Sequence, residues 1–239
     1  IVIWTTTPWT LPANIAICVH PDFVYAKLKV EFDGKEEYWI MARDMANMVL
    51  SSFDIKFEIV EEFEGKDLEG LRYEHPFLNE MPSQRTFDNA HIVILGEHVT
   101  LEEGTGCVHT APGHGEEDFE VGKLYNLPAY SPLDSKGRFT EGKWKGMFVK
   151  DTDPLIIEDL KKKGLLIKFV EIEHKYPFCW RCGSPLIFMA TEQWFLRVSE
   201  IKSEIIRENE KVEWIPDWAA KRYVNGVENV GDWCVSRPV

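Results

Sequence analysis

Several features that would place this 239-residue chain in a special class are scarce or absent. No apolar run approaches the roughly 20 residues that a membrane helix needs, so we expect no membrane partner. Cysteine occurs only 5 times, an odd and sparse set that favours a reducing compartment over a disulfide framework. Lys and Arg number 27 against 40 Asp and Glu, and the net charge of −13 argues against a DNA partner. These absences predict a globular cytoplasmic chain.

Signature motifs of large enzyme classes are also missing. The sequence contains no Gly-rich phosphate-binding loop, no dinucleotide fingerprint and no Gly-x-Ser-x-Gly elbow, so ATP-driven chemistry is not indicated. A 44% hydrophobic and 13% aromatic composition is nevertheless ample for at least one buried core. The sequence begins with the β-type run Ile1–Trp4 and has no initial Met, so we expect it to be a fragment of a longer protein.

Periodicity predicts strands in most of the first two-thirds and a few helices. Apolar and charged residues alternate over 24–32, and Asp33-Gly34 before the β-type run 38–41 predicts a hairpin. Thr152-Asp153-Pro154 is a helix-start signal, and Gly164 is the matching stop. Further strands are expected at 53–60, 91–95 and 106–110, and further helices at 43–51, 115–126 and from Ser199.

The character of the sequence changes near Lys168, where aromatic and basic residues become interspersed. We therefore expect a main β-rich domain at residues 1–165 and a smaller connecting module at 166–239.

A first candidate site lies in the segment Trp4–Asn14, which presents Thr5, Thr6 and Thr7 between two tryptophans and two prolines. Hydroxyls both donate and accept hydrogen bonds, so such a loop can hold a ribose, a carbonyl or a water. The alternative is structural, because β-branched Thr also suits an exposed strand.

A second candidate site lies in Gly104–Phe119, where a strand delivers His109 and the first turn of a helix carries Asp118. Imidazole and carboxylate converging on one cleft can orient a substrate ammonium and a water. A core histidine with a helix-terminal carboxylate is the structural alternative. A zinc site made by His109, His114 and Asp118 is a third interpretation, although no spaced zinc-hydrolase motif is present.

A third candidate is Cys179-x-x-Cys182 followed by Gly183, the shape of half a zinc knuckle. A structural zinc site needs two more ligands, which Cys234 and His174 or residues outside this chain could supply.

These motifs together resemble isoleucyl-tRNA synthetases, in the expected order and over essentially the whole chain. The stretch 4–14, the stretch 104–118, the Cys pair and Glu192-Gln-Trp-Phe195 carry the resemblance, which is to the inserted editing domain. Valyl and leucyl enzymes share this layout but typically have Thr-Thr-Arg-Pro in the first motif and lack a histidine at the place of His109. A valyl- or leucyl-type editing domain is thus the nearest alternative.

The resemblance implies an α+β fold: a β-barrel-like mixed-sheet editing domain with a few short helices and a small zinc-ribbon-like connecting module. It implies an editing hydrolase that removes valine from the 3′ end of mischarged tRNA(Ile), and valyl-adenylate too, because one methylene gives an amino acid pocket only about 1–3 kcal/mol of discrimination. The other partner would be the remainder of the synthetase, including its ATP site. Editing would need no cofactor, and a structural zinc at Cys179 and Cys182 would be completed by residues outside the chain.

The resemblance also assigns roles by motif position. Asp118 would pair with the substrate ammonium, and His109 would form the wall that admits valine and excludes isoleucine. Thr5, Thr6, Thr7 and Asn14 would line the site, where the hydroxyls hold the terminal ribose and position the attacking water. Trp9 would contribute an apolar or stacking surface nearby. A non-catalytic tRNA-docking or zinc-ribbon module is the alternative from a different class.

Overall fold

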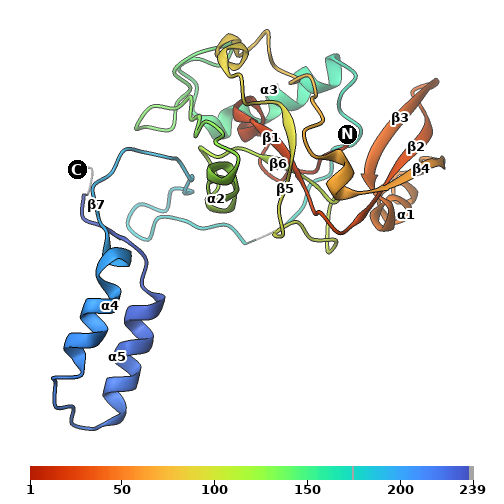
Figure 1. Ribbon diagram of the computed structural model, residues 1–239. Helices are drawn as coiled ribbons and strands as arrows, with labels where there is room; N and C mark the ends of the chain where they lie inside the picture. The colour runs from red at the N-terminus through yellow and green to blue at the C-terminus, as the bar shows by residue number, and fades with distance from the viewer. Residues whose placement is uncertain (174, 237–239) are drawn as a thin grey trace. The chain divides into compact units, whose positions relative to one another are not determined.

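A computed structural model describes residues 1–173 and 175–236, which form two compact units, Ile1–Ala190 and Thr191–Val239 (Figure 1). This division lies beyond the boundary expected near residue 165. Residues after 165 still pack in the first unit, because Ala190 N–H donates to the Gly113 carbonyl (2.8 Å) and Ile187 contacts a core cluster. The functional assignment of the two parts as editing domain and connecting module stays a prediction.

Two three-stranded sheets form the framework of the first unit. One has the order β5-β1-β6, with β1 parallel to β5 and antiparallel to β6, and the other is the antiparallel sheet β3-β2-β4. The predicted hairpin is confirmed: Asp33 and Gly34 have φ values of 48° and 73°, the left-handed conformation that a two-residue turn needs. The strands are β1 (Ala16–Val19), β2 (Val24–Phe32), β3 (Lys35–Ala42), β4 (Phe57–Glu64), β5 (Ile92–Leu95) and β6 (Cys107–Thr110).

Short helices connect and cover these sheets, and the expected mixed α+β class is confirmed. The helix expected to begin at Thr152 begins earlier, and Thr152 is not its cap. Val149 and Ile156 are both fully buried, so packing extends the helix by a turn, and Thr152 Oγ1 donates to the Val149 carbonyl. The helices are η1 (Pro8–Ala13), α1 (Arg43–Ser51), η2 (Gly65–Leu68), η3 (Pro82–Thr86), α2 (Glu116–Leu124) and α3 (Val149–Lys162).

The strand expected from residue 53 begins only at Phe57. Residues 52–55 instead form the turn that closes α1, where Ile55 N–H donates to the Leu50 carbonyl (2.9 Å) and Asp54 has a φ of 57°. The alternating side chains of this stretch thus reflect a turn packed on the sheet, not an extended backbone.

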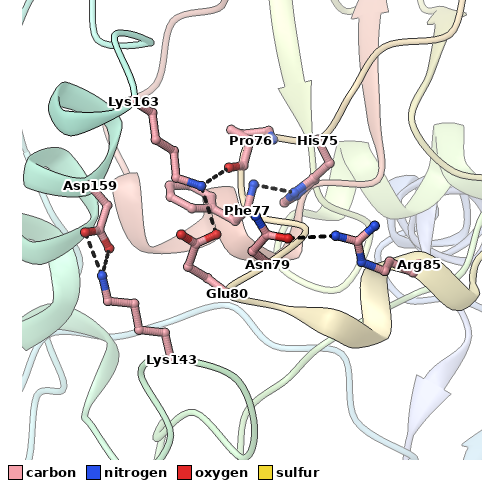
Figure 2. Close-up of polar contacts among 9 residues, drawn as sticks. All are labelled: His75, Pro76, Phe77, Asn79, Glu80, Arg85, Lys143, Asp159 and Lys163. Carbon is pink, nitrogen blue, oxygen red and sulfur yellow. Dashed lines mark hydrogen bonds and ion pairs between the residues drawn. The ribbon is translucent and has the colours of Figure 1, made fainter.

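Polar contacts tie the loop 75–86 to the end of α3 (Figure 2). Lys163 Nζ donates to the Pro76 carbonyl (2.7 Å) and pairs with Glu80 (2.9 Å). Beside this contact, Lys143 Nζ lies 2.6 Å from a carboxylate oxygen of the nearly buried Asp159. These contacts fix the end of α3, a helix that also packs against η1.

The second unit consists of two neighbouring helices and a two-stranded sheet. The helix expected from Ser199 is confirmed as α4 (Val198–Asn209), and α5 (Trp218–Asn229) was not predicted. Strand β7 (Phe195–Leu196) pairs with β8 (Trp233–Cys234) in antiparallel register. Within the described ranges of the whole chain, none of the helices combines the length and apolar character needed to cross a membrane.

Candidate functional site

The first unit contains a cavity of about 480 Å³ between segments that are far apart in sequence. One wall is the loop before η1, a second is the connection from β6 into α2, and a third is the loop 98–106. The structure brings six of the sequence-predicted candidate residues to this cavity, namely Thr5, Thr6, Thr7, His109, His114 and Asp118. The convergence expected for His109 and Asp118 is therefore present.

The threonine loop is held by its own hydrogen bonds. Thr7 N–H donates to Thr5 Oγ1 (3.0 Å), and the Thr10 hydroxyl donates to the Thr7 carbonyl (2.8 Å). The expected strand before this loop is a single parallel bridge from Trp4 to Val108, because Pro8 starts the helix η1 soon after. The loop thus begins beside β6, which places the hydroxyls next to the histidine strand.

His109 lies on β6 at 8% exposure, and both of its ring nitrogens are engaged. Asn14 Nδ2 lies 2.8 Å from Nδ1, and Thr10 Oγ1 lies 3.0 Å from Nε2. Because an amide nitrogen only donates, Nδ1 accepts, so the neutral ring carries its proton on Nε2 and donates to Thr10. Burial, with a smaller contribution from His114, lowers the pKa of His109 to about 3. The ring is therefore a fixed neutral group at pH 7.

Asp118 is the third residue of α2, and its Oδ2 accepts the Ala111 N–H at 2.9 Å. Burial raises the pKa of this carboxyl, and the Ala111 hydrogen bond partly opposes that shift. No Lys, Arg or His within residues 1–173 and 175–236 forms an ion pair with Asp118. A carboxylate on a cavity wall without a cationic protein partner is suited to bind a cationic ligand.

Gly115, the residue before α2, allows this carboxylate to fold back on the helix start. A Cβ at Gly115 would come within 2.8 Å of Asp118 Oδ2 and 3.0 Å of its Cγ. Any side chain there would displace the carboxylate, so the glycine in the sequence motif has a packing reason.

Two further histidines line the cavity. His114 Nδ1 donates to the Phe188 carbonyl (3.0 Å), and burial lowers its pKa. The Nε2 atom of His98 is buried without a hydrogen-bond partner in the described structure. The sequence analysis did not identify His98 or Glu103, whose positions depend on tertiary packing, and it included Thr10 only as part of the segment 4–14. Across the described residues, no three His, Cys, Asp or Glu side chains form a group that could hold a metal ion, and this includes His109, His114 and Asp118.

Trp9 and Asn14 lie behind the cavity and do not line it. Trp9 is 3% exposed in a core cluster, and its ring meets that of His114 edge to face at 5.1 Å. Asn14 is buried behind His109. Direct contact of either residue with a substrate stays a prediction, and their observed contacts are with the two histidines.

Cys179 and Cys182 form a tight turn. Gly183 N–H donates to the Cys179 carbonyl and Cys179 N–H to the Ser184 carbonyl, both at 2.8 Å, and Gly183 has a φ of 70°. Hydrogen bonds from Ser184 lower the pKa of Cys182. Among the candidate additional ligands, His174 lies outside the described residues and Cys234 belongs to the second unit. Zinc at this turn stays a prediction.

Comparisons with known proteins agree on one family. The profile described as "tRNA synthetases class I (I, L, M and V)" matches residues 22–239. The chain is 64% identical to the isoleucine–tRNA ligase of Thermococcus kodakarensis and 59% identical to that of Methanocaldococcus jannaschii, with 99% of the chain covered in both. It spans only 23% and 24% of the lengths of these relatives.

A solved structure described as "The crystal structure of GlLeuRS-CP1" shares the fold. The TM-score is 0.50 at 17% identity, and the match covers 71% of this chain and 83% of that one.

Proposed function

Because the chain belongs to the class I tRNA synthetases of the isoleucine, leucine, methionine and valine group, we propose that its cavity hydrolyses mischarged aminoacyl-tRNA. The observation that carries this proposal is the meeting of the Thr5–Thr7 hydroxyls, His109 and Asp118 in one cavity. The relatives at 59–64% identity are named isoleucine–tRNA ligases, so the substrate we propose is valine joined to tRNA(Ile), together with valyl-adenylate.

Asp118 would hold the α-ammonium of the misplaced amino acid. One oxygen is already fixed by the Ala111 N–H, which leaves the other for a charge-assisted contact with the ligand. The carboxylate comes from the start of a helix, so the backbone holds it in place without a flexible stem. This contact would determine which end of the substrate enters the cavity.

The threonine hydroxyls would hold the terminal ribose and the attacking water. An aminoacyl ester is already activated, so positioning and electrostatics suffice without a covalent nucleophile. The hydrogen bonds from Thr7 N–H to Thr5 and from Thr10 to the Thr7 carbonyl keep this loop in one conformation. A cavity with ordered hydroxyls fits this role better than proton transfer through His109, whose two nitrogens are engaged.

His109 would separate valine from isoleucine by size. Its ring lines the cavity, is held on both sides and has a pKa far below 7, so it serves as a wall and not as a base. The partners of the domain would be the 3′ end of the tRNA and the remainder of the synthetase.

A catalytically silent tRNA-docking or zinc-ribbon module is the second candidate. The observation in its favour is a set of exposed tryptophans, because flat aromatic rings can stack on bases. They are Trp180, Trp194, Trp218 and Trp233.

The test is deacylation of valyl-tRNA(Ile) and isoleucyl-tRNA(Ile) by the 239-residue chain, with and without a chelator. We expect valine release that persists in chelator and little isoleucine release. Loss of release in chelator would favour a metal-dependent hydrolase, and retained tRNA binding without release would favour the docking module.

A further inference from the structure

The orientation of His109 depends on Asn14, whose side chain lies between the ring and the backbone. Asn14 Nδ2 donates to the Ala16 carbonyl (2.8 Å) and lies 3.4 Å from the Thr110 carbonyl. Carbonyl oxygens only accept hydrogen bonds, so the nitrogen side of the amide must face them. The amide oxygen consequently faces the other way, where a donor is required.

Tyr73 supplies that donor, because its phenol hydrogen-bonds Asn14 Oδ1. Burial raises the pKa of Tyr73, so the hydroxyl keeps its proton. The Tyr73 backbone is fixed on the edge of the first sheet, where its N–H donates to the His91 carbonyl (3.0 Å), and its ring meets that of His91 at 5.9 Å. Tyr73 does not line the cavity.

The hydrogen bonds then run in one direction toward the cavity. Tyr73 donates to Asn14, Asn14 donates to His109 Nδ1, and His109 Nε2 donates to Thr10. Thr10 in turn donates to the carbonyl of Thr7, a cavity residue. Asn14, His109 and Thr10 each accept a hydrogen bond from the preceding group and donate one to the next, and only the Nε2-protonated ring satisfies both neighbours of His109.

We propose that Tyr73 is a positioning residue for isoleucine exclusion, acting through Asn14 to hold the His109 ring in one orientation. The proposal rests on the proposed function for its effect on substrate choice. Its structural part, the hydrogen bond that Tyr73 supports between Asn14 and His109 Nδ1, does not depend on that function.

The test replaces Tyr73 with Phe, which removes the hydroxyl and keeps the ring. We expect valyl-tRNA(Ile) hydrolysis to stay within about twofold and isoleucyl-tRNA(Ile) hydrolysis to rise about three- to tenfold, the scale of one neutral hydrogen bond. Tyr130→Phe is the matched control, because the half-buried Tyr130 hydroxyl bonds Ser83 and Glu141 away from the cavity. It should leave the ratio of the two rates unchanged.

A double-mutant cycle distinguishes positioning from general loosening. In an Asn14→Ala background, Tyr73→Phe should change the ratio by less than about twofold, since the hydroxyl acts through Asn14. An equal effect in both backgrounds would overturn the proposal, as would an unchanged ratio in a folded Tyr73→Phe chain.

Nitrogen NMR of ¹⁵N-histidine-labelled chain gives a readout independent of hydrolysis. His109 should show a protonated Nε2 and a bare Nδ1 in all three chains. In Tyr73→Phe the Nδ1 resonance should move toward that of a nitrogen that accepts no hydrogen bond, and in Tyr130→Phe it should stay at its position in the parent. An unchanged Nδ1 resonance in Tyr73→Phe would refute the positioning role. If the parent chain fails to hydrolyse valyl-tRNA(Ile) while the Nδ1 resonance responds as expected, the proposed function fails and the positioning of His109 stands.

Discussion

Replacing Asp118 with Asn separates the charge of this residue from its structural role. An asparagine oxygen can still accept the Ala111 N–H that now lies 2.9 Å from Oδ2, but it offers no negative charge to a substrate ammonium. Hydrogen bonds to charged groups contribute about 1.5–3 kcal/mol. We therefore expect kcat/KM for valyl-tRNA(Ile) deacylation to fall about 10- to 150-fold, measured as release of labelled valine.

The same substitution should not destabilise the chain at pH 7. Burial raises the pKa of Asp118 in the folded state above its value in the unfolded chain, so the folded chain binds a proton more readily. The protonated carboxyl therefore adds to the free energy of unfolding at low pH, and this contribution is lost as the pH rises through the folded pKa. At pH 7 the ionised carboxylate carries a desolvation cost that Asn avoids. Urea unfolding should show Asp118→Asn at least as stable as the parent at pH 7, with its advantage shrinking as the pH is lowered.

Glu116→Gln is the matched control, since it removes one negative charge from the first turn of the same helix. Glu116 does not line the cavity. Its deacylation rate should match that of the parent. Full activity of a folded Asp118→Asn chain, or an equal loss in Glu116→Gln, would refute the assignment of Asp118 as the ammonium partner.

Three other substitutions test separate parts of the structure. His109→Ala should leave valyl-tRNA(Ile) hydrolysis largely intact and newly permit isoleucyl-tRNA(Ile) hydrolysis, whereas slowing of both rates by about 10²–10⁴ would identify a general base. Changing Cys179 and Cys182 together to Ser should leave valine release unchanged, and its complete loss in a folded variant would contradict a purely structural turn. Lys143→Met should lower the free energy of unfolding by about 1–3 kcal/mol, because it leaves the nearly buried Asp159 carboxylate unpaired, and an unchanged urea midpoint would contradict this.

The sequence predicted correctly the elements whose conformation depends on residues adjacent in the chain. The Asp33-Gly34 turn is set by two residues that tolerate positive φ, and the hairpin followed. The predicted start of α3 was wrong because Val149 is buried in the core, and a local cap signal carries no information on burial. Helix α5 was missed although Asp217 stands at its N-cap position, because the aromatic and basic residues of this stretch were interpreted as a change of composition and not as a helix.

The cavity could be anticipated in part because its components are carried by short motifs. His109 and Asp118 lie only nine residues apart, on a strand and on the start of the next helix, so a local motif is enough to predict that they approach each other. The contribution of Tyr73 could not be predicted, because it lies 59 residues from Asn14 and meets it only through the pairing of the first sheet. Long-range hydrogen bonds of this kind have no local pattern.

The hydrogen bonds of His109 give a physical basis for the size filter that we propose. Burying one more methylene gains about 0.8 kcal/mol, so a wall that yields at a lower cost would admit the larger amino acid. Displacing His109 would break the contacts to Asn14 (2.8 Å) and Thr10 (3.0 Å), at about 0.5–1.5 kcal/mol each. The cost of moving the wall is then at least comparable to the gain from the extra methylene. An aliphatic side chain of similar size would lack these anchors and could change rotamer, so the hydrogen bonds behind the ring would give the proposed size filter its rigidity.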